Sequence, residues 1–219
     1  MLKSVPVKPG VTMASRFAYA AGTMGLLANL CLIVMYALLG LQGGSPEDGT
    51  SLGLAFHAAG SSNDLLGSLS TACMIPVALY LGKRLPRRRT VLLVQTAGLA
   101  AMALLSIGGP LLVLGVLAFE IQTPIAMGAL IFLSVWLLVT SRWLRLSGAV
   151  PTRVTRFGEL VGVGFLAGYV VVGLGLLLPW MSWPQLVVFG VGVLVGLPAY
   201  LGFPVWFLLL GRHLGASAE

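Results

Sequence analysis

The chain has 219 residues, of which 58% are hydrophobic and only 9% are charged, and its formal net charge is +7. Soluble domains carry about 25% charged residues, so this composition excludes an ordinary soluble enzyme, a disordered chain and a disulfide-rich secreted module. With a mean hydropathy of +1.01, the chain is predicted to be an all-α, polytopic transmembrane helical bundle.

Six apolar segments are long enough to cross the roughly 30 Å hydrocarbon core of a bilayer as helices. In chain order they cover residues 17–41, 65–81, 90–107, 111–140, 159–179 and 185–210. The separators between them are polar, basic or rich in glycine and proline, which favours turns. We therefore expect an N-terminal segment over residues 1–16, a six-helix domain over residues 17–210 and a tail over residues 211–219.

The basic residues predict the orientation of the bundle. All 13 lysines and arginines fall before the first segment, between the second and third, between the fourth and fifth, or after the sixth. Because basic residues collect on the cytoplasmic side of membrane proteins, both termini are expected in the cytoplasm. The positive charge is then a topology signal, and nucleic-acid binding is not expected.

Acidic and aromatic residues complete this assignment. Residues 42–64 are predicted to form an outer loop, part of which, residues 52–60, suits a short interfacial helix. Three acidic residues fall in this loop: Glu47, Asp48 and Asp64. Tryptophans favour membrane interfaces. We expect Trp180 and Trp183 on the outer side and Trp136, Trp143 and Trp206 on the inner side.

Pairs of glycines spaced four residues apart occur in the last two segments. They are Gly158 and Gly162, Gly164 and Gly168, and Gly192 and Gly196. Small residues at this GxxxG spacing let helix backbones approach closely in lipid. We interpret them as packing positions within one chain, with a homo-oligomeric interface as the alternative.

Polar residues inside the apolar segments are the best candidates for a functional site, because they are costly in a membrane. The candidates for a ligand-binding pocket are Asn29, Gln95, Glu120, Gln122 and Thr123. We hypothesise that Glu120 faces the bundle interior near Asn29 or Gln95 and lines a polar pocket open to the outer side. The alternative is a crossing over residues 121–140, which leaves Glu120 solvated at the outer headgroup level.

No sequence motif indicates catalysis, a metal or a cofactor. The chain has no HExxH, GxSxG or Walker motif, and no lysine lies within an apolar segment. We therefore expect no catalytic residues, no metal site and no cofactor.

Three stretches of the chain together resemble a known family. They are RFAYAAG at the start of the first segment, the linker SGAVPTRVTRFGELVGVG and the terminal FPVWFLLLGRHL. They resemble an uncharacterised family of bacterial six-helix membrane proteins, defined only as a domain of unknown function. The resemblance extends over most of the chain and implies a multi-pass protein of the bacterial inner (plasma) membrane. It supplies no catalytic residues and no substrate.

These observations leave three functions open. The first is a non-catalytic membrane protein, an accessory or binding component for a lipid or a membrane-protein partner. The second is a small-molecule transporter or permease, which the proline- and glycine-interrupted segments favour. The third is a membrane-embedded enzyme that modifies a lipid, with Glu120 as the acid or base; further polar groups close to Glu120 would favour it. The expected partners are membrane lipids and either another membrane protein or a second copy of the chain.

Overall fold

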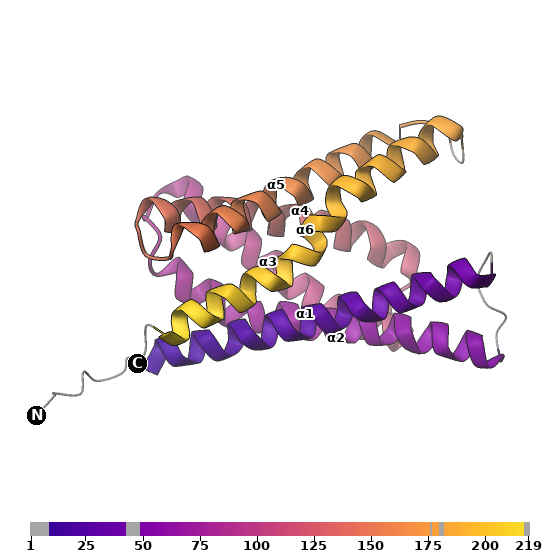
Figure 1. Ribbon diagram of the computed structural model, residues 1–219, viewed down its shortest axis with the longest axis horizontal. Helices are drawn as coiled ribbons and strands as arrows, with labels where there is room; N and C mark the ends of the chain where they lie inside the picture. Colours follow the sequence, from indigo (N-terminus) through magenta and orange to yellow (C-terminus); the bar gives the residue numbers. More distant parts are fainter. Residues whose placement is uncertain (1–8, 43–48, 176, 180–181, 217–219) are drawn as a thin grey trace, which may run out of the picture.

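The computed structural model describes residues 9–42, 49–175, 177–179 and 182–216. Over these residues the fold is all helical, with six helices: α1 Pro9–Gln42, α2 Ser51–Gly82, α3 Arg89–Val113, α4 Phe119–Leu146, α5 Thr152–Gly175 and α6 Trp183–Ala216 (Figure 1). Each helix is long and apolar enough to cross a membrane, which confirms the predicted polytopic helical fold. α1 and α6 extend past the limits expected for the six-helix domain, at residues 17 and 210.

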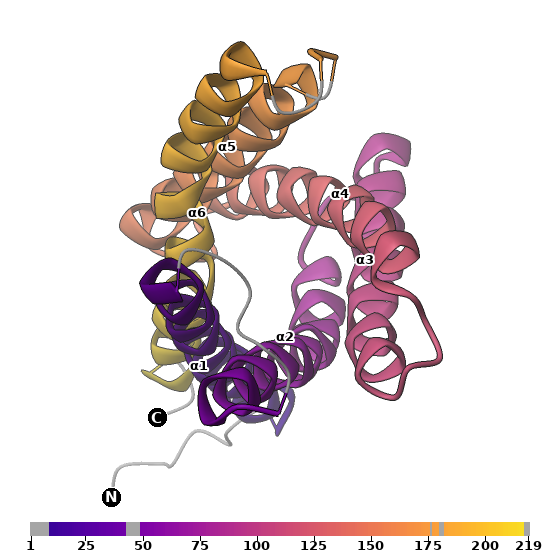
Figure 2. The same cartoon turned by 90° about the vertical axis from the view of Figure 1, so that its right-hand side faces the viewer.

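The six helices are arranged as a ring. Each helix packs against its neighbours in sequence, and α6 also packs against α1, so that the ring closes. Seen along the long axis of the molecule, the helices surround a common centre (Figure 2). The start of α1 and the end of α6 lie at the same end of the bundle in Figure 1, together with the α2–α3 and α4–α5 connections.

We call this end of the bundle the basic end, because the described lysines and arginines lie at it or within the adjoining helical turns. Its location in the cytoplasm stays a prediction. Three residues expected at the opposite side, Glu47, Asp48 and Trp180, lie outside the described residues. Trp183 is exposed at the first position of α6, at the end far from the termini.

Large side chains fill the half of the ring nearest the basic end. Trp136 and Trp206 are completely buried, and their rings meet edge to face with centroids 6.3 Å apart. The Trp136 indole nitrogen donates to Gln95 Oε1 at 2.9 Å, and the Trp206 nitrogen donates to the Val154 carbonyl at 3.1 Å. Because both N–H groups have partners inside the bundle, both rings are core residues rather than surface markers of a membrane interface. We call Trp136, Trp206 and the buried Phe207 the tryptophan core.

α2 is longer than the sequence pattern predicted. It begins at Ser51 rather than near residue 65, and the side chain of Thr50 caps it by accepting a hydrogen bond from the Gly53 nitrogen at 3.0 Å. The expected interfacial helix over residues 52–60 is the first part of α2. Asp64 consequently lies inside a helix and not in an outer loop.

The boundary between α3 and α4 also differs from the prediction. α3 continues through Pro110 to Val113, the chain turns at Gly115 with a φ of +68°, and α4 begins at Phe119. The long apolar segment 111–140 is therefore divided between two helices. Gly109 permits this course because it lies against α2, where a β-carbon would come within 2.5 Å of the Asp64 carbonyl oxygen.

Candidate functional site

A pocket of about 230 Å³, lined by both polar and apolar side chains, lies inside the ring, and all six helices contribute to its wall. Its lining residues are further from the basic end than the tryptophan core is. On α4 they extend from Gln122 to Leu133 and so precede Trp136. On α6 they extend from Tyr200 to Pro204 and so precede Trp206. The tryptophan core therefore fills the ring on the basic side of the pocket.

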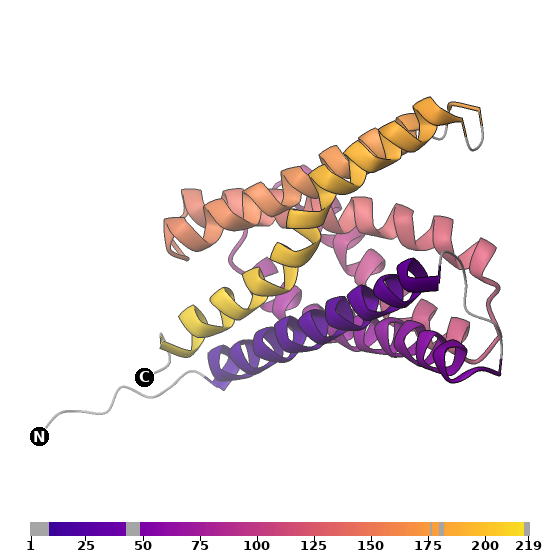
Figure 3. The ribbon, with the colours of Figure 1, turned by 45° about the vertical axis from the view of Figure 1, so that its right-hand side comes forward.

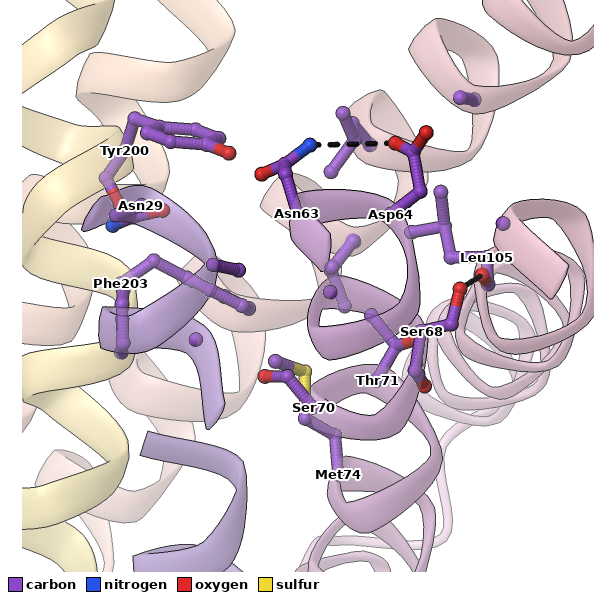
Figure 4. A pocket seen from close by; sticks show the side chains of 18 of the residues that line it. Asn29, Asn63, Asp64, Ser68, Ser70, Thr71, Met74, Leu105, Tyr200 and Phe203 are labelled. Carbon is purple, nitrogen blue, oxygen red and sulfur yellow. Dashed lines mark hydrogen bonds between the residues drawn. The ribbon is translucent and has the colours of Figure 1, made fainter. Parts of the chain in front are cut away.

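α2 supplies most of the polar side chains of this pocket. They are Asn63, Asp64, Ser68, Ser70 and Thr71 (Figure 4). The lining positions 63/64, 67/68, 70/71 and 74 recur every three or four residues, which places them on one face of a helix. This face turns toward the centre of the ring, so that its polar groups avoid contact with lipid chains.

Several hydroxyl and amide hydrogens in the pocket already bond to backbone carbonyls. Ser68 Oγ donates to the Leu105 carbonyl at 3.0 Å, and Ser70 Oγ donates to the Ala21 carbonyl at 2.8 Å. Asn29 Nδ2 donates to a backbone carbonyl of α6 at 3.3 Å. These bonds connect the walls of the pocket and leave side-chain oxygen lone pairs available to a ligand.

Asp64 is the one charged residue among those that line the pocket. Its carboxylate accepts a hydrogen bond from Asn63 Nδ2 at 3.3 Å. Figure 4 shows Asn63 and Asp64 on one side of the pocket, with Asn29 and Tyr200 on the other. Ionisable residues inside membrane-spanning helices usually mark a ligand, ion or proton site, because burying a carboxylate in a membrane is costly. Asp64 is therefore the strongest candidate for a functional residue.

An apolar groove of about 530 Å³ lies beside the pocket, between α1, α5 and α6. The groove and the pocket share three residues, Asn29, Phe165 and Tyr200. Figures 1 and 3 show α1 and α6 close together near the basic end and diverging toward the opposite end. We call this opening the side groove. Apart from Asn29, the side chains that line it are aliphatic or aromatic, as suits a surface in contact with lipid chains.

The five polar residues expected to form one pocket are not brought together. Asn29 and Gln122 line the pocket, whereas Gln95 lies in the packed half and binds the Trp136 indole. Thr123 Oγ1 donates to a carbonyl of its own helix at 2.8 Å and does not line the pocket. Glu120 is exposed in the first turn of α4, and so it does not face the interior beside Asn29 or Gln95. A carboxylate there suits the positive end of the helix dipole.

The sequence predicts an outer loop that ends at Asp64, and so it does not indicate Asp64 as a residue of the pocket. One signal could have identified it. The polar and small residues from Asn63 to Met74 follow a helical period, and that period continues without interruption into the apolar part of the same segment.

The six predicted packing glycines all face neighbouring helices of the same chain. A β-carbon on Gly162 would lie 3.0 Å from the Leu138 nitrogen, and one on Gly168 would lie 2.8 Å from the Gly196 α-carbon. The remaining four, Gly158, Gly164, Gly192 and Gly196, also face α4, α5 or α6. Whether the four-residue spacing itself drives helix association stays a prediction.

Comparisons with known proteins give no relative: no family model, no curated protein and no solved structure matches the chain. The resemblance noted in the sequence thus stays a prediction.

Proposed function

We propose that this protein binds a lipid-like amphipathic molecule in the membrane and does not transform it. The polar head of the ligand occupies the pocket beside Asp64, and its apolar tail lies in the side groove. The proposal includes the bacterial inner membrane as the location and a cytoplasmic position for the basic end, as the distribution of basic residues favours.

The observation that carries the proposal is the connection between a pocket that contains several polar groups and a groove that is almost entirely apolar. The pocket contains a carboxylate, amides and hydroxyls, whereas the side groove is lined almost entirely by apolar side chains. They meet at Asn29, Phe165 and Tyr200. A molecule with a small polar head and an apolar tail matches this arrangement, because each part then lies in a medium that suits it.

The hydrogen bonds inside the pocket favour one chemistry for the head. The hydroxyl hydrogens of Ser68 and Ser70 and an amide hydrogen of Asn29 are engaged by backbone carbonyls. The carboxylate of Asp64 and the side-chain carbonyl of Asn29 can only accept hydrogen bonds from a ligand. We therefore propose a head group that donates hydrogen bonds, such as an ammonium or a cluster of hydroxyls.

The same geometry favours binding over the two other functions. Transport requires access to the pocket from both sides of the membrane, but the tryptophan core fills the ring on the basic side. Acid–base chemistry commonly pairs a carboxylate with a second carboxylate, a histidine or a lysine, and the described residues that line the pocket include one carboxylate, Asp64, and the phenol of Tyr200 but none of those partners. Glu120 lies outside its wall.

The proposal is tested by measuring which amphipathic molecules co-purify with the protein. Wild-type protein and the variant Asp64→Asn are purified in a mild detergent, and the extracted molecules are quantified per protein by mass spectrometry. We expect one class of amphiphile to be enriched over its abundance in the membrane. Its amount should fall about tenfold or more in the variant, because a hydrogen bond to a charged group contributes about 1.5–3 kcal/mol.

Glu120→Gln is the matched control. It makes the same change from carboxylate to amide at an exposed position that does not line the pocket. We expect it to retain the amphiphile at the wild-type level. The proposal is wrong if no class is enriched on the wild-type protein, or if Asp64→Asn and Glu120→Gln retain equal amounts.

A further inference from the structure

We infer that a second cavity, between α4 and α5 at the basic end, binds the head group of an anionic phospholipid. The cavity has a volume of about 420 Å³ and is lined by Arg142, Arg145 and Arg156 together with Glu159 and three aliphatic side chains. It is separate from the pocket of the proposed ligand, with which it shares no lining residue.

The charges of this cavity do not balance. Arg145 Nε donates to Glu159 Oε1 at 2.8 Å, in an ion pair whose side chains remain 32% and 20% exposed. Arg142 and Arg156 are exposed, and neither has a hydrogen bond or ion pair within the described part of the chain. Three guanidinium groups therefore face one carboxylate, and the excess positive charge matches a phosphate.

The Arg145–Glu159 pair gives the site a fixed element. It joins the last turns of α4 to the first turns of α5, and so it holds one guanidinium in place in the cavity that the two exposed arginines also line. The terminal nitrogens of Arg145 remain able to donate to a further oxygen. A ligand phosphate would thus meet one positioned arginine and two that adapt to it.

The aliphatic residues of the cavity lie toward the membrane centre. Leu138 is seven positions before Arg145 on α4, which corresponds to roughly 10 Å along a helix axis. Leu160 and Val163 follow Arg156 on α5, and their exposed fractions are 70% and 51%. The cavity therefore combines a basic rim at headgroup depth with an apolar floor that faces the acyl chains.

This combination identifies the ligand as a lipid. A basic cavity between transmembrane helices on the basic side is a common site for anionic head groups. A soluble anion or an acidic protein segment would use the arginines but not the exposed apolar floor. A phospholipid with a net negative head uses both parts at once.

The test is native mass spectrometry of the purified full-length protein in detergent with added phosphatidylglycerol or phosphatidylcholine. Wild-type protein should retain phosphatidylglycerol in preference to phosphatidylcholine. In the double variant Arg142→Gln/Arg156→Gln, the ratio of bound phosphatidylglycerol to bound phosphatidylcholine should fall about tenfold to thirtyfold. Each basic residue near an anionic surface contributes about fivefold to the binding of an anionic lipid. Arg145 is left unchanged, so that Glu159 keeps its partner.

The matched control is Arg16→Gln/Arg212→Gln, which removes the same charge from two exposed positions of the basic end that do not line the cavity. We expect it to keep the wild-type preference. An equal loss in both double variants would show a general effect of charge and overturn the proposal, as would an unchanged preference in the first. Displacement of phosphatidylglycerol by 10 mM inorganic phosphate would show a site for free anions and would also overturn it.

The single variants keep the test decisive if the double variant does not fold. Arg142→Gln and Arg156→Gln should each lower the preference for phosphatidylglycerol about fivefold. Retention of the full preference by both single variants would exclude the site.

Discussion

Gln95 and Asp64 are both polar residues inside a membrane-spanning helix, but their surroundings differ. Gln95 Nε2 donates to the Ala78 carbonyl at 2.7 Å, and its Oε1 accepts from the Trp136 indole at 2.9 Å. The Gln95 amide therefore connects α2, α3 and α4, and both its nitrogen and its oxygen already bond to neighbouring helices. Asp64 faces a cavity and has one amide donor, Asn63. Gln95 therefore has a structural role, whereas the ligand-binding role of Asp64 is a proposal.

The role of Gln95 predicts a coupled loss of stability. Gln95→Leu and Trp136→Phe should each lower the free energy of unfolding by at least about 1 kcal/mol, because each removes the bond between Gln95 and the Trp136 indole. Gln95→Leu also loses the bond to the Ala78 carbonyl, and Trp136→Phe also leaves a cavity. The double variant should lose less than the sum of the two. Unfolding in detergent measures all three. Strictly additive losses would show that the bond contributes nothing, and Thr96→Val, an exposed position on α3, is the neutral control.

At the scale of single residues, the sequence predicted the composition of the pocket only in part. Asn29 and Gln122 are polar residues within apolar segments, and both line the pocket. The carboxylate was assigned to Glu120 because it stands alone in an apolar run. Asp64 was overlooked because its neighbours Ser61 and Ser62 resemble a loop. Which of two acidic residues enters a cavity depends on where each helix begins, and composition alone does not define that position.

Among the helices, length and hydropathy predicted how many there are but not all of their ends. The start of α2 depends on a cap by Thr50, whose signal is weaker than the polar run that follows it. The end of α3 depends on Gly109, which faces the Asp64 backbone, and on Gly115, which takes a positive φ. These requirements arise from contacts between helices and from a turn. The hydropathy of the sequence contains no information on either of them.

The contact between α4 and α5 predicts that Gly162 cannot accept a large side chain. Gly162→Leu should lower the melting temperature in detergent by roughly 3–10 °C, because a β-carbon would already press on Leu138 backbone atoms and overpacking costs about 1–3 kcal/mol. Gly173→Leu, on the same helix with open space at its β-position, is the matched control and should melt as wild type does. Equal melting of both variants would place Gly162 against lipid.

The sequence predicted six spans and a basic end, but not that the helices form a closed ring. Closure depends on contacts between the two ends of the chain. Ser15 Oγ donates to the Gly211 carbonyl at 2.8 Å, and a β-carbon on Gly22 would lie 2.8 Å from the Pro204 carbonyl oxygen. α1 and α6 lie at opposite ends of the sequence, and no local sequence pattern predicts that they pack closely against each other. The ring encloses the pocket and leaves the side groove where α1 and α6 diverge, and the proposed function depends on both.

The most direct test of the proposed function is a structure of the full-length protein in nanodiscs formed from its native membrane. We predict an elongated density that lies in the side groove between α1, α5 and α6, passes Tyr200 and ends within hydrogen-bond distance of the Asp64 carboxylate. A map that resolves the Tyr200 and Phe165 side chains but shows both the pocket and the side groove free of non-protein density would contradict the account.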